Sequence, residues 1–169
     1  MPLSGLDQLG ERTWLSQQGD ENSRAARTTR LRNSSGATST QIMVAQDEVT
    51  WNPNPQAAPD RYLAVSMYSV KAGKVSEFLA LMKDVNETVK KMGKAKNIFV
   101  SRVAYGGDGY EFHVAIGYAS LADIPPQAAF RAAMGDGYNA YVQKLGATVN
   151  GLRREIVRYR PEFSHIPGN

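Results

Sequence analysis

Residues 60–169 alternate between two kinds of hydrophobic spacing, which predict a regular order of strands and helices. Stretches rich in β-branched and aromatic residues predict strands at 61–71, 97–105, 110–118 and 152–159. Between the first two strands, apolar residues recur every three or four positions from Val75 to Met92, as they do along one face of an α-helix. Gly93 is suited to end that helix.

A second helix is expected after the third strand. Pro125 and Pro126 suit a first helical turn, and Gly135 predicts a break or kink before the apolar pattern resumes. The glycine-rich stretch 106–109 predicts a hairpin between the second and third strands. The resulting order, βαββαβ, predicts an α+β, ferredoxin-like fold, in which a four-stranded antiparallel sheet carries two helices on one face.

The sheet face away from the helices requires cover if it is apolar. In the strand 110–118, large apolar residues point to one side, and Glu111, His113, Ala115 and Gly117 point to the other. Two such sheets that pack face to face would shield each other from water. We therefore expect either a homodimer or a tandem-repeat partner, joined through the open sheet face.

The first 59 residues differ from the rest in composition. Residues 1–40 are polar and are expected to be poorly ordered, or helical with outside support. Residues 41–59 combine a strand-like stretch at 41–50 with a linker that holds three prolines, and 60–169 form the main domain. Because 48–53 resembles 162–167, the front segment could instead be the remnant of a first βαββαβ unit whose beginning is missing.

Composition excludes several classes of protein. The chain has no cysteine, which excludes disulfides, thiolate metal sites and cysteine nucleophiles, and its two histidines argue against a histidine metal site. The net charge is +4, but no aromatic residues interleave the lysines, so no nucleic-acid partner is expected. No apolar run is long enough to span a membrane, and no signal-peptide pattern is visible at Met1. We expect a water-soluble domain without metal or cofactor; its compartment is not assigned.

The start of the main domain resembles a known family. Residues 62–78 contain Tyr-Ser-Val-Lys followed by Ala-Gly-Lys and a helix with Glu-Phe, and 118–122 read Tyr-Ala-Ser-Leu-Ala. Both segments resemble NIPSNAP-like domains of the dimeric α+β barrel superfamily, over roughly residues 60–160. The resemblance implies a ferredoxin-like domain that pairs sheet to sheet. Where that family has a Trp and a His, this chain has Ile116 and Val114, so no catalytic residue is carried over.

His113 is the main candidate for chemistry, because small neighbours on its face leave room for a ligand and Glu111 is a nearby carboxylate. The alternative is a structural histidine that hydrogen bonds in the interior. Ser66, Tyr68 and Tyr159 would line a pocket with His113 if they share the open face.

Arg102 lies in the middle of a predicted strand and requires a carboxylate partner if it is buried. Glu155 on the last strand is the candidate partner, and an anion site at Arg102 is the alternative.

The expected function is a small-molecule-binding or assembly module without clear catalytic residues, with a small apolar or aromatic ligand. The ligand-binding candidates are His113, Ser66, Tyr68, Arg102 and Tyr159. The alternative is a cofactor-independent oxygenase or isomerase that acts on a small aromatic or carbonyl compound. In that case His113 would be the base, and Tyr68 or Tyr159 would polarise the substrate.

Overall fold

The computed structural model describes residues 20–23, 25, 26, 29 and 40–160. The chain divides into two compact units: Met1–Ser39 with His165–Asn169, and Thr40–Ser164. In the first unit, residues 21–23, 25, 26 and 29 are helical. The expectation for residues 1–40 falls mostly outside the described residues, as does the second copy of the possible repeat at 162–167. The fold that follows is that of residues 40–160.

The elements from residue 60 onward follow the predicted order. They are listed here with the two that precede them: β1 (Ile42–Ala45), η2 (Asp47–Val49), β2 (Tyr62–Val70), α4 (Val75–Lys91), β3 (Asn97–Tyr105), β4 (Glu111–Tyr118), η3 (Leu121–Asp123), α5 (Gln127–Met134), α6 (Gly137–Thr148) and β5 (Val149–Arg158). The predicted break in the second helix is present. Gly135 has φ +55° and separates α5 from α6, a conformation that glycine adopts without a steric penalty.

The sheet has five strands, so the prediction of four was wrong by one. Its order is β1-β3-β4-β2-β5, and every neighbouring pair is antiparallel. The added strand β1 comes from the strand-like segment 41–50 and places Met43 opposite Val103. It supplies hydrogen-bond partners to β3, which would otherwise form the edge of the sheet. The rest of that segment is not a strand, because 47–49 form a 3₁₀ turn.

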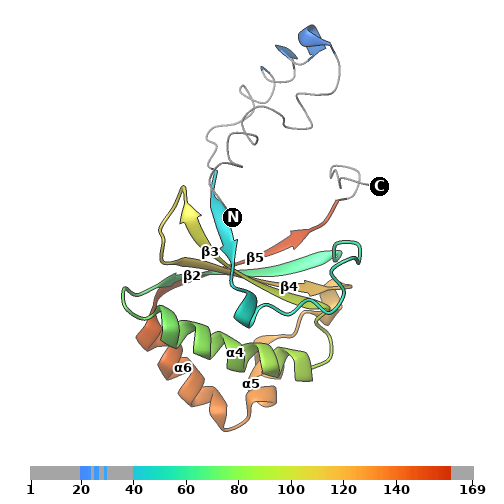
Figure 1. Cartoon of the computed structure of the whole chain (residues 1–169). Coiled ribbons are helices and arrows are strands. Elements are labelled where there is room, and N and C mark those ends of the chain that lie inside the picture. Colours follow the sequence, from blue (N-terminus) through green and yellow to red (C-terminus); the bar gives the residue numbers. More distant parts are fainter. Residues whose placement is uncertain (1–19, 24, 27–28, 30–39, 161–169) are drawn as a thin grey trace. The chain divides into compact units, whose positions relative to one another are not determined.

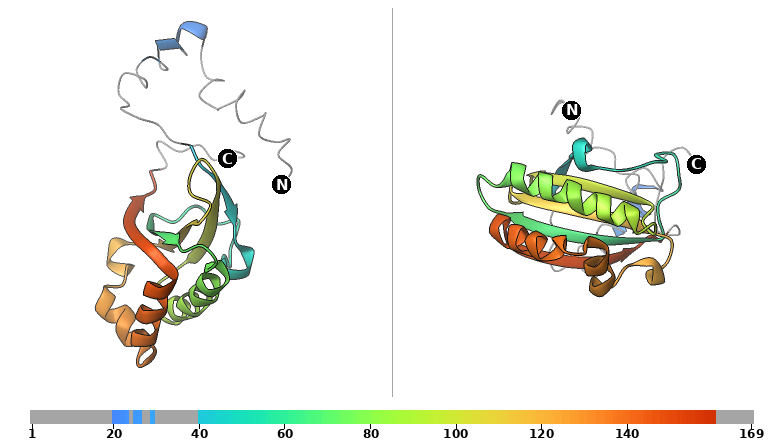
Figure 2. Two further views of the ribbon diagram at one scale, coloured as in Figure 1. Left: turned by 90° about the vertical axis from the view of Figure 1, so that its left-hand side faces the viewer. Right: turned by 90° about the horizontal axis from the view of Figure 1, so that it is seen from below.

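Helices α4, α5 and α6 lie on one face of the sheet (Figure 1). Seen from below, α4 and α6 lie side by side across it (Figure 2). The core sits between these layers, where the Phe78 ring of α4 lies 5.1 Å from the ring of Tyr68 and 5.0 Å from that of Phe112. No helix of residues 40–160 covers the opposite face, which we call the open face.

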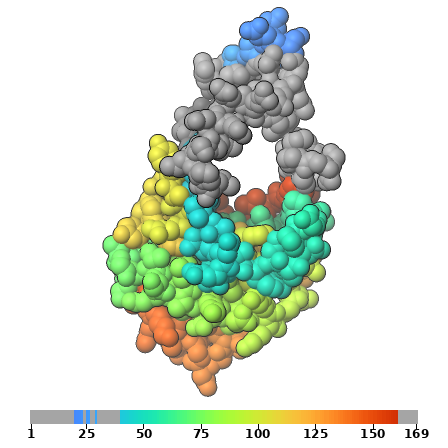
Figure 3. Space-filling view, viewed as in Figure 1, coloured from blue at the N-terminus to red at the C-terminus, as the bar shows by residue number. Residues whose placement is uncertain are grey.

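Residues 41–51 pack with the same core. The side chain of Asn86 on α4 is buried, and its amide nitrogen donates a hydrogen bond to the carbonyl of Val49 in η2. The backbone N–H of Val100 donates to the Thr50 hydroxyl at 3.1 Å, and Trp51 forms a β-bridge with Ile98. In the space-filling view this stretch, in cyan, lies against the body of the domain (Figure 3). The front strand is thereby held to the ferredoxin-like core by polar and apolar contacts.

Candidate functional site

Strand alternation places the predicted site residues on two different faces. On β2, Ser66 and Tyr68 stand opposite Val114 and Phe112 of β4, on the side that the helices cover. His113 stands between Met67 of β2 and Ser101 of β3, on the open face. The structure therefore does not bring His113 together with Ser66 and Tyr68, because successive side chains of a strand point to opposite sides.

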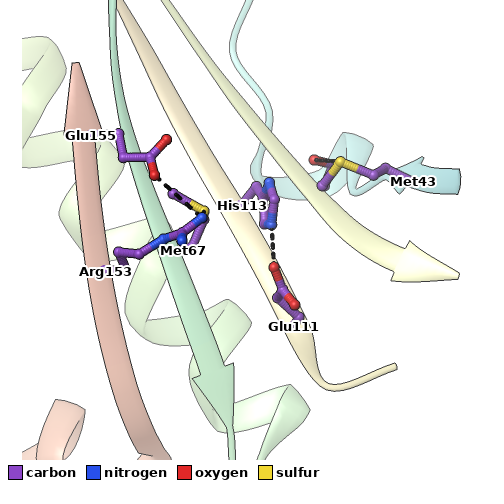
Figure 4. Close-up of polar contacts among 7 residues, drawn as sticks. Met43, Met67, Glu111, His113, Arg153 and Glu155 are labelled. Atoms are coloured by element: carbon purple, nitrogen blue, oxygen red, sulfur yellow. Dashed lines mark hydrogen bonds and ion pairs between the residues drawn. The ribbon is translucent and has the colours of Figure 1, made fainter. Parts of the chain in front are cut away.

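His113 is held by the carboxylate that the sequence indicated. Its Nε2 lies 2.6 Å from Oε1 of Glu111, and the two side chains are 18% and 27% exposed (Figure 4). Arg153 and Glu155 form a second ion pair on the same face, at 3.2 Å. The open face thus carries a half-buried imidazole with a fixed carboxylate partner. That arrangement orients the ring.

The predicted pairing of Arg102 with Glu155 is wrong. Arg102 lies on β3 and points to the helix side, where its Nε donates to the carbonyl of Gly109. Its guanidinium lies over the rings of Tyr110 and Phe112, at 5.8 and 5.7 Å from their centroids. Glu155 lies on β5, at the other edge of the sheet. A backbone carbonyl and two aromatic faces therefore satisfy this arginine in place of a carboxylate.

Tyr159 does not join His113 either. It follows the end of β5, and its N–H donates to the carbonyl of Arg61 at 2.9 Å. Tyr159 therefore lies at the end of the β2–β5 pair where Tyr62 faces Arg158. His113 faces Met67, which is further along β2.

A cavity of about 200 Å³ lies under the helices, and we call it the tyrosine pocket. Its floor is the helix-side face of β2, β4 and β5, and its walls come from α4, α5 and α6. The polar residues that line it are Ser66, Tyr68, Tyr118, Gln127, Tyr138, Tyr141 and Arg154. The apolar residues are Ala64, Val85, Val89, Ile116, Ile124, Pro125 and Phe130. An apolar hollow with a few converging polar groups is the usual form of a small-molecule site.

Burial sets the protonation of the pocket's tyrosines. It raises the pKa of Tyr118 to about 12 and raises the pKa values of Tyr68 and Tyr141 as well, because a phenolate loses its hydration there. For Tyr68, the Arg154 charge and polar contacts with Ser66, Arg154 and Tyr141 oppose the rise without cancelling it. All three hydroxyls, like those of ordinary tyrosines, are protonated near neutral pH and can donate hydrogen bonds, and burial extends this range to more alkaline pH.

The break at Gly135 shapes the helical side of the pocket. It lets the short α5 turn back toward α6, so that the ring of Phe130 meets that of Tyr141 edge to face at 5.7 Å. Gln127 at the start of α5 donates a hydrogen bond to the Tyr138 hydroxyl at 2.9 Å. These contacts fix aromatic walls that a continuous helix would not present in this position.

The sequence did not reveal this pocket as a unit. Ser66 and Tyr68 were proposed as ligand-binding residues, but Tyr118, Tyr141 and Arg154 come from β4, α6 and β5. The register of the sheet connects two of these residues, because Ser66 of β2 faces Arg154 of β5. Their proximity could be inferred only from the pairing of β2 with β5, which the sequence does not give.

A larger hollow of about 540 Å³ lies at one end of the open face, beneath the segment 52–60. Prolines and alanines form much of its wall, with Leu63 and Phe99 from the sheet. Asn97 donates a hydrogen bond to the Asp60 carboxylate here, and a side chain at Gly117 would collide with both residues. Asn97 and Asp60 thus contact each other at this end of the sheet.

Two further classes of site are absent from the part of the chain that the structure describes. Within it, no three His, Asp or Glu side chains converge in a way that could hold a metal ion. No helix there combines the length and the apolar character required to cross a bilayer.

Comparison with known proteins identifies the fold. No family model and no curated protein sequence matches the chain. A proposed monooxygenase from Fusobacterium nucleatum has a similar structure, with TM-score 0.53 and 12% identity over 80% of this chain and 62% of that one. The chain thus spans less than two thirds of that protein's length. At such identity the likeness shows the fold and not the activity.

Two further matches have lower scores. A NIPSNAP family protein from Agrobacterium tumefaciens has TM-score 0.45 and 20% identity, over 67% of this chain and 96% of its own. A proposed antibiotic biosynthesis monooxygenase from Bordetella bronchiseptica has TM-score 0.47 and 8% identity, over 59% of this chain and 96% of its own. The matched structures include a NIPSNAP family protein, and the order of elements with the antiparallel sheet gives the domain a ferredoxin-like α+β fold.

Proposed function

We propose that this chain is a small-molecule-binding module of the α+β barrel type, and that the tyrosine pocket holds a small apolar or aromatic ligand. The observation that carries the proposal is the convergence of Tyr68, Tyr118, Tyr141 and Arg154 on an apolar cavity of about 200 Å³. Packed interiors leave few voids larger than a water molecule, so a hollow of this size with oriented donors favours a binding role.

Filling the cavity tests this function. Ala64 forms part of the floor, so Ala64→Leu should abolish the chemical-shift changes that benzyl alcohol causes in the wild-type protein. The control Ala72→Leu changes an exposed turn residue and should leave binding intact. If benzyl alcohol binds both variants and the wild type equally, or if neither benzyl alcohol nor benzoate binds any of them, the pocket is not the binding site.

We also propose that two copies associate through the open face. Apolar side chains lie along it, and no helix of residues 40–160 covers it. They are Leu63, Val65, Met67, Phe99, Ala115 and Val157. Association would remove this surface from water and enclose the His113–Glu111 pair.

A second candidate function is that of a cofactor-independent oxygenase or isomerase with His113 as base. The fixed contact between His113 and Glu111 favours it, and the Fusobacterium protein of similar fold is a proposed monooxygenase. Tyr68 cannot assist this base, because it lies on the opposite face. Turnover of a small aromatic substrate that His113→Ala abolishes, without loss of benzyl alcohol binding, would support this candidate. Turnover that survives the substitution would contradict it.

A further inference from the structure

The size and charge of the tyrosine pocket restrict the ligand that it can hold. We propose that it selects a single-ring aromatic carboxylate, with the ring among the apolar walls and the carboxylate against Arg154 at the edge of the cavity. This proposal rests on the binding function proposed above and narrows it to one ligand class.

Volume limits the ligand to one ring. A dry protein cavity of about 150 Å³ is large enough to bind benzene. The tyrosine pocket, at about 200 Å³, has room for such a ring and one small substituent, whereas a fused pair of rings would extend out of it into solvent.

The walls favour a flat apolar ring. Phe130 and Tyr141 meet edge to face at 5.7 Å, and the branched side chains of Val85, Val89 and Ile116 complete the lining. Aromatic ligands pack well in such surroundings, because offset and edge-to-face contacts add to the burial of apolar surface. The pocket thus offers its apolar surface to the ring and keeps its polar groups for the substituent.

Charge identifies that substituent. Arg154 is the one ionisable residue of the lining that carries a full charge near neutral pH, and no Asp or Glu lines the cavity. The neighbouring residues Arg153 and Glu155 of β5 add no charge to the pocket, because they pair with each other on the open face. Among the described residues, Arg154 forms no ion pair, whereas it contacts the hydroxyl of Tyr68. A guanidinium with a hydroxyl beside it matches a carboxylate, which accepts charge-assisted hydrogen bonds from both.

The tyrosines add to this preference. Tyrosine hydroxyls are protonated at neutral pH, and burial here moves their pKa values further from it, so Tyr68, Tyr118 and Tyr141 carry no negative charge that would repel an anion. A ligand that can only donate hydrogen bonds would find one cation and the hydroxyls of Tyr68 and Tyr141 at this end of the cavity.

Three probes test the ligand class by NMR titration: benzoate, benzyl alcohol and 2-naphthoate. Benzoate should bind at least about tenfold more tightly than benzyl alcohol, which has the same ring without the charge. The larger 2-naphthoate should bind more weakly than benzoate. Equal affinities for benzoate and benzyl alcohol, or tighter binding of 2-naphthoate, would overturn the proposal while leaving a binding pocket in place.

A pair of neighbouring arginines gives a matched control. Arg154→Gln should lower benzoate affinity about tenfold and leave benzyl alcohol affinity unchanged, whereas Arg153→Gln, on the other face, should alter neither. Circular dichroism of both variants checks that they fold. Benzoate binding that Arg154→Gln does not weaken would refute the role of Arg154. If neither benzoate nor benzyl alcohol binds the wild type, the proposed binding function itself fails.

Discussion

The two faces of the sheet differ in how far their side chains are removed from water, although the same strands form both. On the helix side, Phe112 is fully buried, and the tyrosines Tyr68, Tyr118 and Tyr141 of the pocket are almost fully removed from water. On the open face, His113, Glu111 and Arg153 keep part of their exposure. Hydrogen bonds and charge interactions are stronger where water is excluded, which is why we place the proposed ligand on the helix side and the proposed association on the open face.

The largest expected effect is a loss of stability that should be greater for a substitution on the helix side than for one on the open face. Phe112→Ala should lower the free energy of unfolding by about 3–5 kcal/mol, because the ring is fully buried against Phe78. Phe99→Ala, at a residue that is 39% exposed, should cost less than about 1 kcal/mol in dilute protein. Urea unfolding measures both, and Phe112→Leu serves if the alanine variant does not fold. Equal costs at the two positions would remove the distinction between the faces.

The next effect concerns association. Phe99→Asp places a charge on the open face and should raise the dissociation constant of a dimer at least about tenfold, because an unpaired charge would be buried. Leu121→Asp is the control, since Leu121 lies in η3 away from the sheet and is 53% exposed. Sedimentation equilibrium gives both constants. A wild-type protein that stays monomeric at micromolar concentration would contradict the proposed pairing.

The smallest effect is a pH dependence confined to alkaline solution. Burial raises the pKa of Tyr118 from 10.0 to about 12, so the unfolded chain loses this proton before the folded one does. The contribution to stability is therefore complete below pH 10 and declines as the pH rises toward 12. Tyr118→Phe should make the alkaline loss of stability less steep, as measured by urea unfolding between those pH values. If stability declines with pH as steeply in the variant as in the wild type, burial does not raise the pKa of Tyr118.

Much of the fold was predictable because each element carries its own periodicity. The apolar stripe predicted α4, and the alternation in 110–118 gave β4. The pairing of β1 with β3 was not predictable, because a four-residue apolar segment does not specify which sheet edge it joins. The stripe also gave no sign that Asn86 is buried, since its partner is the backbone carbonyl of Val49 from a distant segment.

The candidate site was predictable only in part. His113 and Glu111 contact each other because they are two residues apart on one strand face. The face of Ser66 and Tyr68 could not be assigned, since β2 reads YLAVSMYSV and is apolar on both sides. Arg102 and Glu155 were paired on charge alone, although one lies on a strand near the β1 edge and the other on the opposite edge.

The long edge strand β5 affects the tendency of these molecules to aggregate. It presents ten residues along an unpaired margin of the described sheet, and Arg153, Arg154 and Arg158 stand within it. Repulsion between such arginines disfavours the joining of two margins into a continuous ribbon, which is the route to fibrous aggregates. The arginines of this strand therefore disfavour edge-to-edge polymerisation of the chain.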